Sequence, residues 1–295
     1  MIPAGRQDPQ GLALLRAALQ RGEGLRVIMT STKALSRLND LCRDWHTSPF
    51  LFGFGLRNLF GLAPEAAEAL IRQKQEKEPV EVAPELVQEI RWHTNDHPFL
   101  IQYLCQRLFD GEKGCLRPIE PPDLLPDVML TSLFEIDYQY LCAGERAILR
   151  QVAVEGVVDE AGLQRATGMD LARLRNFLYG LTKLGYLREQ DGGWAAHNSF
   201  FSSWLQANRD LLAKIPPCEV SDQTTQEMLI LGQKQEMDYL QEQLDIHKRN
   251  LGQLEVQRAR YGLDVPLYLT HQIEYVQSEI ARITEELNKL KAMRA

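Results

Sequence analysis

The clearest fold signal in the sequence lies in residues 171–196, which read LARLRNFLYGLTKLGYLREQDGGWAA. Apolar side chains recur every three or four residues over its first half, as they do along one face of a helix. Its second half has two short runs on either side of Asp191-Gly192-Gly193, the pattern of a β-hairpin with a glycine turn. This stretch therefore predicts an amphipathic helix followed by a hairpin.

Two shorter helices are predicted just before this stretch. Ile148 and Val152 would line the first, and residues 159–166 would form the second, with Asp159 as its N-cap. Three helices followed by a hairpin predict a winged helix-turn-helix, which we place in a domain at residues 126–210.

Helical patterns also dominate the region before this domain. Ala63-Pro64-Glu65 and Pro84-Glu85 each place a proline and an acidic residue in a first helical turn, where both residue types are favourable. A third helix is expected to start at Pro98. We therefore predict a helical domain at residues 63–125, which ends in a proline-rich extended connector.

The first 62 residues predict only part of an α/β fold. Leu12, Leu15 and Leu19 repeat at helical spacing, and residues 25–30 form an apolar run rich enough in β-branched residues for a strand. A helix and one buried strand make half of an α/β unit, and a single strand cannot form a sheet. Residues 1–62 are therefore expected to be a core remnant, within a chain that is mainly α.

Two heptad series follow a polar linker at residues 211–223. Steps of three and four residues place one apolar seam on each of two helices, and a turn at residues 261–266 interrupts the pattern. The predicted structure for residues 224–295 is an antiparallel coiled-coil hairpin about 30–35 Å long. The predicted seam comprises Met237, Leu240, Leu244, His247, Leu251 and Leu254 in the first helix, and Leu269, Ile273, Val276, Ile280, Ile283, Leu287 and Leu290 in the second.

The overall composition is that of an ordinary globular protein. The chain has 295 residues, of which 44% are hydrophobic and 25% charged, enough for about two domains. Its formal net charge of −7 differs in sign from that of most proteins that bind nucleic acid by bulk charge. Five scattered cysteines without a CxxC pair favour reduced thiols and a cytoplasmic location. No apolar run predicts a membrane span.

The motifs that usually carry catalysis or phosphate binding are missing from the sequence. It contains no GxxxxGK[ST], HExxH, GxSxG or CxxC. A phosphate cradle needs successive backbone N–H groups at a helix N-terminus together with a lysine. His93 and His97 precede the helix that starts at Pro98, so they do not share a helix face as metal ligands would. We therefore predict no catalytic residues, no metal site and no enzyme activity for the chain alone.

The winged-helix prediction raises DNA binding as an alternative function. The third helix carries Arg173, Arg175 and Lys183, but residues 145–205 contain seven basic and seven acidic side chains. Affinity for DNA draws on the release of counterions by several cationic side chains, which a neutral module supplies poorly. A module that contacts protein is the better match, and a DNA-binding regulator dimerised by the hairpin is the alternative.

The order of these segments resembles the second half of a STAND-type AAA+ ATPase, a signal-transduction NTPase with a nucleotide-binding core, a helical lid and a winged helix. The resemblance spans roughly residues 8–210 and rests on VIMTST at 27–32, LAPEAA at 62–67 and HTNDHPFLIQ at 93–102. It implies that residues 63–125 are the lid and that the chain is a C-terminal portion without the P-loop and Walker B strand. ATP or ADP would then bind only if the missing core is supplied.

The resemblance also implies three cofactor-binding residues. Thr30 would be the sensor-1 residue that faces the γ-phosphate, and Pro98 the lid proline that packs on the base, with Asp96 where the family has glycine. His197 would contact the β-phosphate of ADP, with Asn198 in place of the family's aspartate. From the residues alone, Pro98 also fits an ordinary first-turn proline, and His197 a residue that closes the wing strand.

The hairpin resembles a short helical module of bacterial effector and conflict-system proteins, through NLGQLE at 250–255 and YGLDVPL at 261–267. That resemblance implies a protein partner or self-association through residues 224–295. The expected function is the non-catalytic regulatory portion of a bacterial STAND-type signalling ATPase. An adaptor without any nucleotide role is a third hypothesis.

Overall fold

The computed structural model is mainly helical, with a few short antiparallel strands, as the sequence predicts. The predicted strand at residues 25–30, except for Ile28, falls outside the part of the chain that the structure describes, as does nearly all of the predicted remnant at residues 1–62. The described residues are 61–73, 80–212, 214, 222–261 and 265–294, with a few isolated positions before residue 61.

The chain forms two compact units. Unit 1 contains Met1–Gly168 and Leu181–Asp222, and unit 2 contains Met169–Gly180 and Gln223–Ala295. The boundary between them falls inside one continuous helix, α10 (Leu171–Lys183).

From residue 61 on, unit 1 contains a cluster of three helices, each of which has proline at its start, as predicted. The three are α4 (Pro64–Ile71), α5 (Pro84–Thr94) and α6 (Pro98–Leu108). Proline suits this position because the first-turn N–H has no helical partner to lose. The apolar faces meet in one core, in which Ile71, Ile90, Ile101 and Leu104 are fully buried.

The proline-rich connector folds back on this cluster instead of staying fully extended. It contains β1 (Phe109–Asp110) paired with β2 (Cys115–Leu116) and a 3₁₀ turn, η2 (Pro121–Leu124). The Arg117 guanidinium donates two hydrogen bonds to the Asp123 carboxylate, at 2.6 and 2.7 Å, and Arg107 donates to the Asp123 carbonyl. These contacts hold η2 beside α6 and lower the pKa of Asp123.

Residues 128–196 form four helices and three short strands. In chain order, they are α7 (Val128–Gln139), α8 (Ala143–Glu155), β3 (Val157–Val158), α9 (Glu160–Thr167), α10, β4 (Leu187–Gln190) and β5 (Gly193–Ala196). The helices α8, α9 and α10 and the β4–β5 hairpin are those expected, whereas the sequence did not predict α7 and β3. The three strands form one antiparallel sheet in the order β3-β5-β4. Asp191 and Gly192 make the β4–β5 turn with positive φ angles of 51° and 77°.

Helix α11 (Ser199–Ala207), followed by α12 (Arg209–Leu212), joins the two parts of unit 1. Its Phe200 is buried in the core of α4, α5 and α6, and its ring lies edge-on to Tyr103. The adjacent Phe201 and Trp204 stack on each other and contact Phe134 of α7. The helical cluster and the sheet-containing part are therefore packed together through α11.

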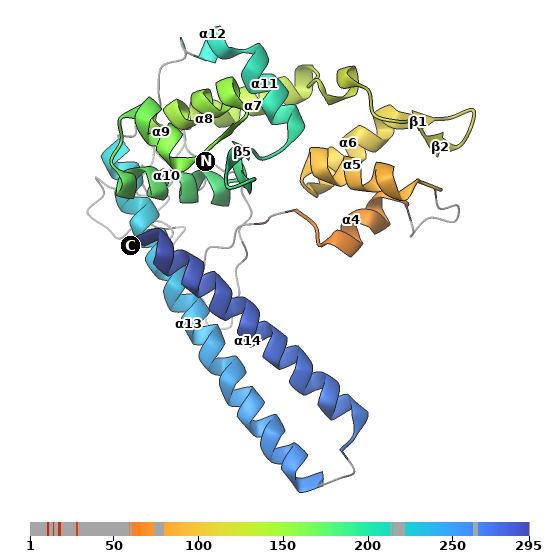
Figure 1. Cartoon of the computed structure of the whole chain (residues 1–295), viewed down its shortest axis with the longest axis vertical. Helices are drawn as coiled ribbons and strands as arrows, with labels where there is room; N and C mark the ends of the chain where they lie inside the picture. The colour runs from red at the N-terminus through yellow and green to blue at the C-terminus, as the bar shows by residue number, and fades with distance from the viewer. Residues whose placement is uncertain are drawn as a thin grey trace. The chain divides into compact units, whose positions relative to one another are not determined.

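Unit 2 is dominated by two long antiparallel helices, α13 (Asp222–Tyr261) and α14 (Leu267–Arg294), which lie side by side (Figure 1). Most of the predicted seam is buried: Leu240, Leu244, Leu269, Ile273, Val276, Ile283, Leu287 and Leu290. The 28 residues of α14 span about 42 Å at ~1.5 Å per residue, so the expected length was too short. The seam covers only residues 237–254 and 269–290, whereas α13 starts at Asp222 and α14 continues to Arg294.

None of the helices, within the residues that the structure describes, has both the length and the apolar character needed to cross a membrane.

Candidate functional site

The three predicted cofactor-binding residues have different outcomes. Thr30 lies outside the described residues. Pro98 is the first residue of α6, directly after the α5–α6 turn. His197 lies between β5 and α11, and its backbone N–H donates to the Tyr186 carbonyl at 2.9 Å. Pro98 and His197 therefore both lie in the described part of unit 1.

The α5–α6 turn before Pro98 has an unusual backbone. Asn95 and Asp96 adopt left-handed φ angles of 47° and 55°, which asparagine and aspartate tolerate better than most residues do. Arg91 clamps the Asp96 carboxylate with two hydrogen bonds, at 2.9 and 3.0 Å. The carboxylate raises the pKa of Arg91. Asp96 therefore has a backbone conformation that glycine also adopts readily.

The residues before α4 pack directly against this turn. The Leu62 N–H donates to the Asp96 carbonyl at 2.8 Å. A Cβ atom on Gly61 would lie only 2.6 Å from the Asn95 carbonyl oxygen. Gly61 is therefore needed for the close approach of these two backbone segments.

His197 and the α5–α6 turn meet through Asn95. The Asn95 Nδ2 atom lies 3.1 Å from Nδ1 and 3.0 Å from Nε2 of His197. The His197 Nδ1 atom is also 3.4 Å from the Leu187 carbonyl. The segment around Pro98 and the segment around His197 are thus in contact, although 102 positions separate Asn95 from His197 in the sequence.

A second contact joins the same two segments. His93 Nδ1 lies 2.7 Å from the Ser199 hydroxyl at the start of α11. Burial lowers the pKa of His93; the nearby Glu89 opposes this effect, and the Arg188 guanidinium adds to it. Arg188 lies 4.6 Å from the centre of the Trp92 ring and donates to the Trp92 carbonyl. We call His93, Asn95, Arg188, His197 and Ser199 the junction cluster.

Sequence reasoning missed most of the junction cluster. His93 and Asn95 lie in the stretch HTNDHP that the family resemblance singled out, so a local signal was present. Nothing in the sequence paired that stretch with Arg188 or Ser199, because hydrogen bonds between distant segments leave no periodic pattern.

The junction cluster offers few groups that could hold a phosphate. Asn95 and His197 supply hydrogen-bond donors, but the guanidiniums of Arg91 and Arg188 are engaged by Asp96 and Trp92. Phosphate cradles of the P-loop type combine backbone N–H groups with a lysine, and none of the five residues of the junction cluster is a lysine. Across the described ranges, no three His, Cys, Asp or Glu side chains gather as metal ligands would.

In unit 2, the face of α10 that carries Asn176 and Tyr179 is covered by the first turns of α13. Gln226 Nε2 donates to the Arg173 carbonyl, and Asn176 Nδ2 donates to Gln226 Oε1, both at 2.9 Å. The Tyr179 hydroxyl donates to the Glu236 carboxylate. Burial and this hydrogen bond raise the pKa of Tyr179. This face of α10 is therefore occupied within the chain.

No family model, curated protein or solved structure matches this chain.

Proposed function

We propose that this chain is the non-catalytic regulatory portion of a STAND-type signalling ATPase, lacking P-loop and Walker B, with the α13–α14 hairpin as its protein-docking module. The observation that carries the proposal is the contact between Asn95 and His197. In the family, the lid turn and the end of the winged helix flank the same nucleotide. Contact between the corresponding segments here supports a junction at which a nucleotide would bridge lid and winged helix.

The few phosphate-binding groups at the junction suit a regulatory portion. A chain with two donors and no cradle depends on a partner core for nucleotide affinity. Nucleotide binding would then strengthen or weaken the contact between the lid turn and His197. A contact that is either made or broken is the kind of two-state element that signalling switches use.

The occupied face of α10 favours protein docking over DNA binding. In a winged helix the third helix is the one that would enter the major groove. Here, Asn176 and Tyr179 on that helix contact α13 instead. Docking is therefore assigned to the exposed surface of the hairpin.

Calorimetric titration with ADP tests the nucleotide part of the proposal. The chain alone is expected to give no binding heat. Together with a separately expressed P-loop core of a STAND-type ATPase, it is expected to bind ADP, and His197→Ala should weaken that binding at least about tenfold. His271→Ala, the same substitution on the hairpin, is the matched control. Equal ADP affinity of the wild-type and His197→Ala pairs would contradict the proposal.

A further inference from the structure

Among the described residues of the hairpin, most of the exposed large apolar side chains lie in one half. We define the hairpin tip as residues 248–261 of α13 and 267–280 of α14. Every residue of α13 from Glu255 to Tyr261 is exposed. Leu267 is 71% and Tyr275 63% exposed, well above what a half-buried side chain would show. The large hydrophobic residues exposed at the tip are Val256, Tyr261, Leu267, Tyr268 and Tyr275.

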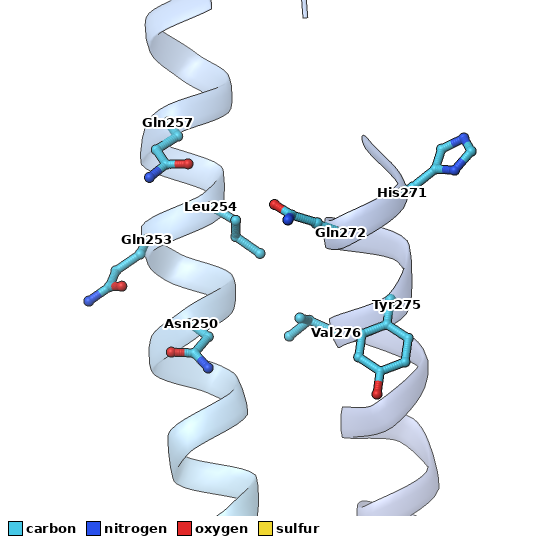
Figure 2. A pocket seen from close by; sticks show the side chains of 8 residues that line it. All are labelled: Asn250, Gln253, Leu254, Gln257, His271, Gln272, Tyr275 and Val276. Carbon is cyan, nitrogen blue, oxygen red and sulfur yellow. The ribbon is translucent and has the colours of Figure 1, made fainter. Parts of the chain in front are cut away.

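The tip also carries an open groove of about 500 Å³ between the two helices. Leu254, Gln272 and Val276 point toward one another across it (Figure 2). The remaining lining side chains are Asn250, Gln253, Gln257, His271 and Tyr275, so the lining contains no Lys, Arg, Asp or Glu. Because the lining consists of amides, aromatic rings and aliphatic side chains, an amphipathic helix can pack against it without burying an unpaired charge.

The charges around this groove are divided between the helices. The tip part of α13 carries four cationic residues and only one acid, whereas the tip part of α14 carries two acids and no Lys or Arg. Within the described structure, the four cations make no ion pair; they are Lys248, Arg249, Arg258 and Arg260. One side of the tip is therefore basic. The other is acidic at the exposed Glu274, because Glu279 pairs with Arg282 just beyond the tip.

The rest of α14 differs from its tip part. Arg282 pairs with Glu279 and Glu286 at 2.9 Å, and Lys289 pairs with Glu285 at 2.8 Å. Four charged residues beyond the tip, Arg282, Glu285, Glu286 and Lys289, are therefore paired within one helix at the usual spacing of three or four residues. The cations of the tip have no such partners, although the same spacing rules apply.

We propose that the hairpin tip is the docking surface for a second copy of this chain. A two-fold pairing places the basic α13 tip of each copy against the acidic α14 tip of the other, so both contacts are complementary. The pairing also covers Tyr275 and the other exposed apolar side chains in a four-helix arrangement. This inference rests on the proposed docking role of the hairpin and names its partner.

Sedimentation velocity of the full chain over a concentration series tests the pairing. The wild-type chain is expected to dimerise. Arg258→Glu/Arg260→Glu makes the α13 tip acidic. Glu274→Lys reverses the charge of the exposed α14 tip acid that Arg282 does not pair. Each variant alone should weaken dimerisation at least about tenfold. An equimolar mixture of the two variants should restore a dimer, because both of its contacts again join opposite charges.

Three controls make the experiment decisive. Lys234→Glu/Lys291→Glu makes the same charge change at exposed positions outside the tip and should leave the dimer intact. Circular dichroism checks that each variant keeps its helices, and Tyr275→Glu tests the apolar part of the surface independently. A monomeric wild-type chain, a dimer that survives all tip substitutions, or a mixture that stays monomeric would each overturn the proposal. The ADP titration does not depend on any of these outcomes.

Discussion

At the residue scale, the α5–α6 turn shows how two chemically different residues can share one backbone requirement. Asn95 and Asp96 both take left-handed φ angles. Asn95 uses its side chain to reach His197, whereas the Asp96 side chain is clamped by Arg91. The turn therefore combines a left-handed backbone with two side-chain contacts. Arg91 fixes Asp96 beside α5, and Asn95 contacts His197 just before α11.

Gly61→Ala should destabilise unit 1, because its Cβ would lie 2.6 Å from the Asn95 carbonyl oxygen and the backbone would have to move. We expect a loss of about 1–3 kcal/mol in the free energy of unfolding, measured by urea denaturation followed by tryptophan fluorescence. Gly111→Ala is the matched control, since the nearest atom to its Cβ would be a Phe109 ring carbon at 3.9 Å. Equal losses in the two variants would contradict this interpretation.

The stability of unit 1 should fall as the pH drops below neutrality, partly because of His93. Burial lowers the pKa of folded His93, so the unfolded chain binds this proton more readily. The stabilisation is complete above the unfolded pKa of about 6.5 and is lost as the pH falls below it. His93→Gln should therefore flatten the dependence of Tm on pH between about pH 7 and pH 5.

The fluorescence-detected Tm, measured at constant ionic strength, checks the pH prediction. His271→Gln replaces an exposed histidine of the hairpin and should leave the slope as in the wild type. The opposing Glu89 carboxylate and the reinforcing Arg188 guanidinium are present in both variants. A slope that His93→Gln leaves unchanged would show that another group controls this pH range.

At the element scale, α13 has two roles along its length. Its middle and tip carry the seam with α14, whereas its first turns bind α10 through the side chains of Gln226 and Glu236. Leu229 of α13 also packs closely against Gly180 of α10. A Cβ atom added at Gly180 would lie 2.5 Å from the Cδ2 atom of Leu229. The contact between α10 and the start of α13 therefore combines hydrogen bonds with apolar packing.

Tyr179→Phe should loosen the first turns of α13, because it removes the donor to the partly buried Glu236 carboxylate. Hydrogen bonds to charged groups contribute about 1.5–3 kcal/mol. We expect faster amide hydrogen exchange in residues 226–240, measured by mass spectrometry. Tyr275→Phe removes an exposed hydroxyl on α14 and should leave these rates unchanged. Equal exchange in both variants would contradict the assigned role of Tyr179.

At the scale of the whole molecule, the division into two units makes a prediction about unfolding. All four tryptophans belong to unit 1, whereas both long helices belong to unit 2. Fluorescence therefore reports on unit 1, and the helical signal in circular dichroism includes the hairpin.

Leu287→Ala should destabilise the hairpin selectively. The residue is 3% exposed in the seam, and its truncation is expected to cost about 2–5 kcal/mol. Part of the unfolding transition seen by circular dichroism should then move to a lower denaturant concentration, while the midpoint seen by fluorescence should not change. Leu104→Ala, in the core of unit 1, should move the fluorescence midpoint instead. Coincident shifts of both signals in either variant would show that the two units unfold as one.

The sequence by itself determined the features that arise within a few residues. Proline at the first position predicted the starts of α4, α5 and α6, because it loses no hydrogen bond there. Alternating steps of three and four predicted the buried seam, and Asp191-Gly192-Gly193 predicted the β4–β5 turn. Each of these depends on local backbone preference or on a repeating apolar pattern.

Tertiary structure alone decided which distant segments meet. Asn95 contacts His197 and Tyr179 contacts Glu236 across separations of 102 and 57 residues. Adjacent Phe200 and Phe201 take part in different clusters, because neighbouring positions on a helix point about 100° apart. No local preference encodes such pairings, since the packing of whole helices brings the side chains within hydrogen-bonding distance.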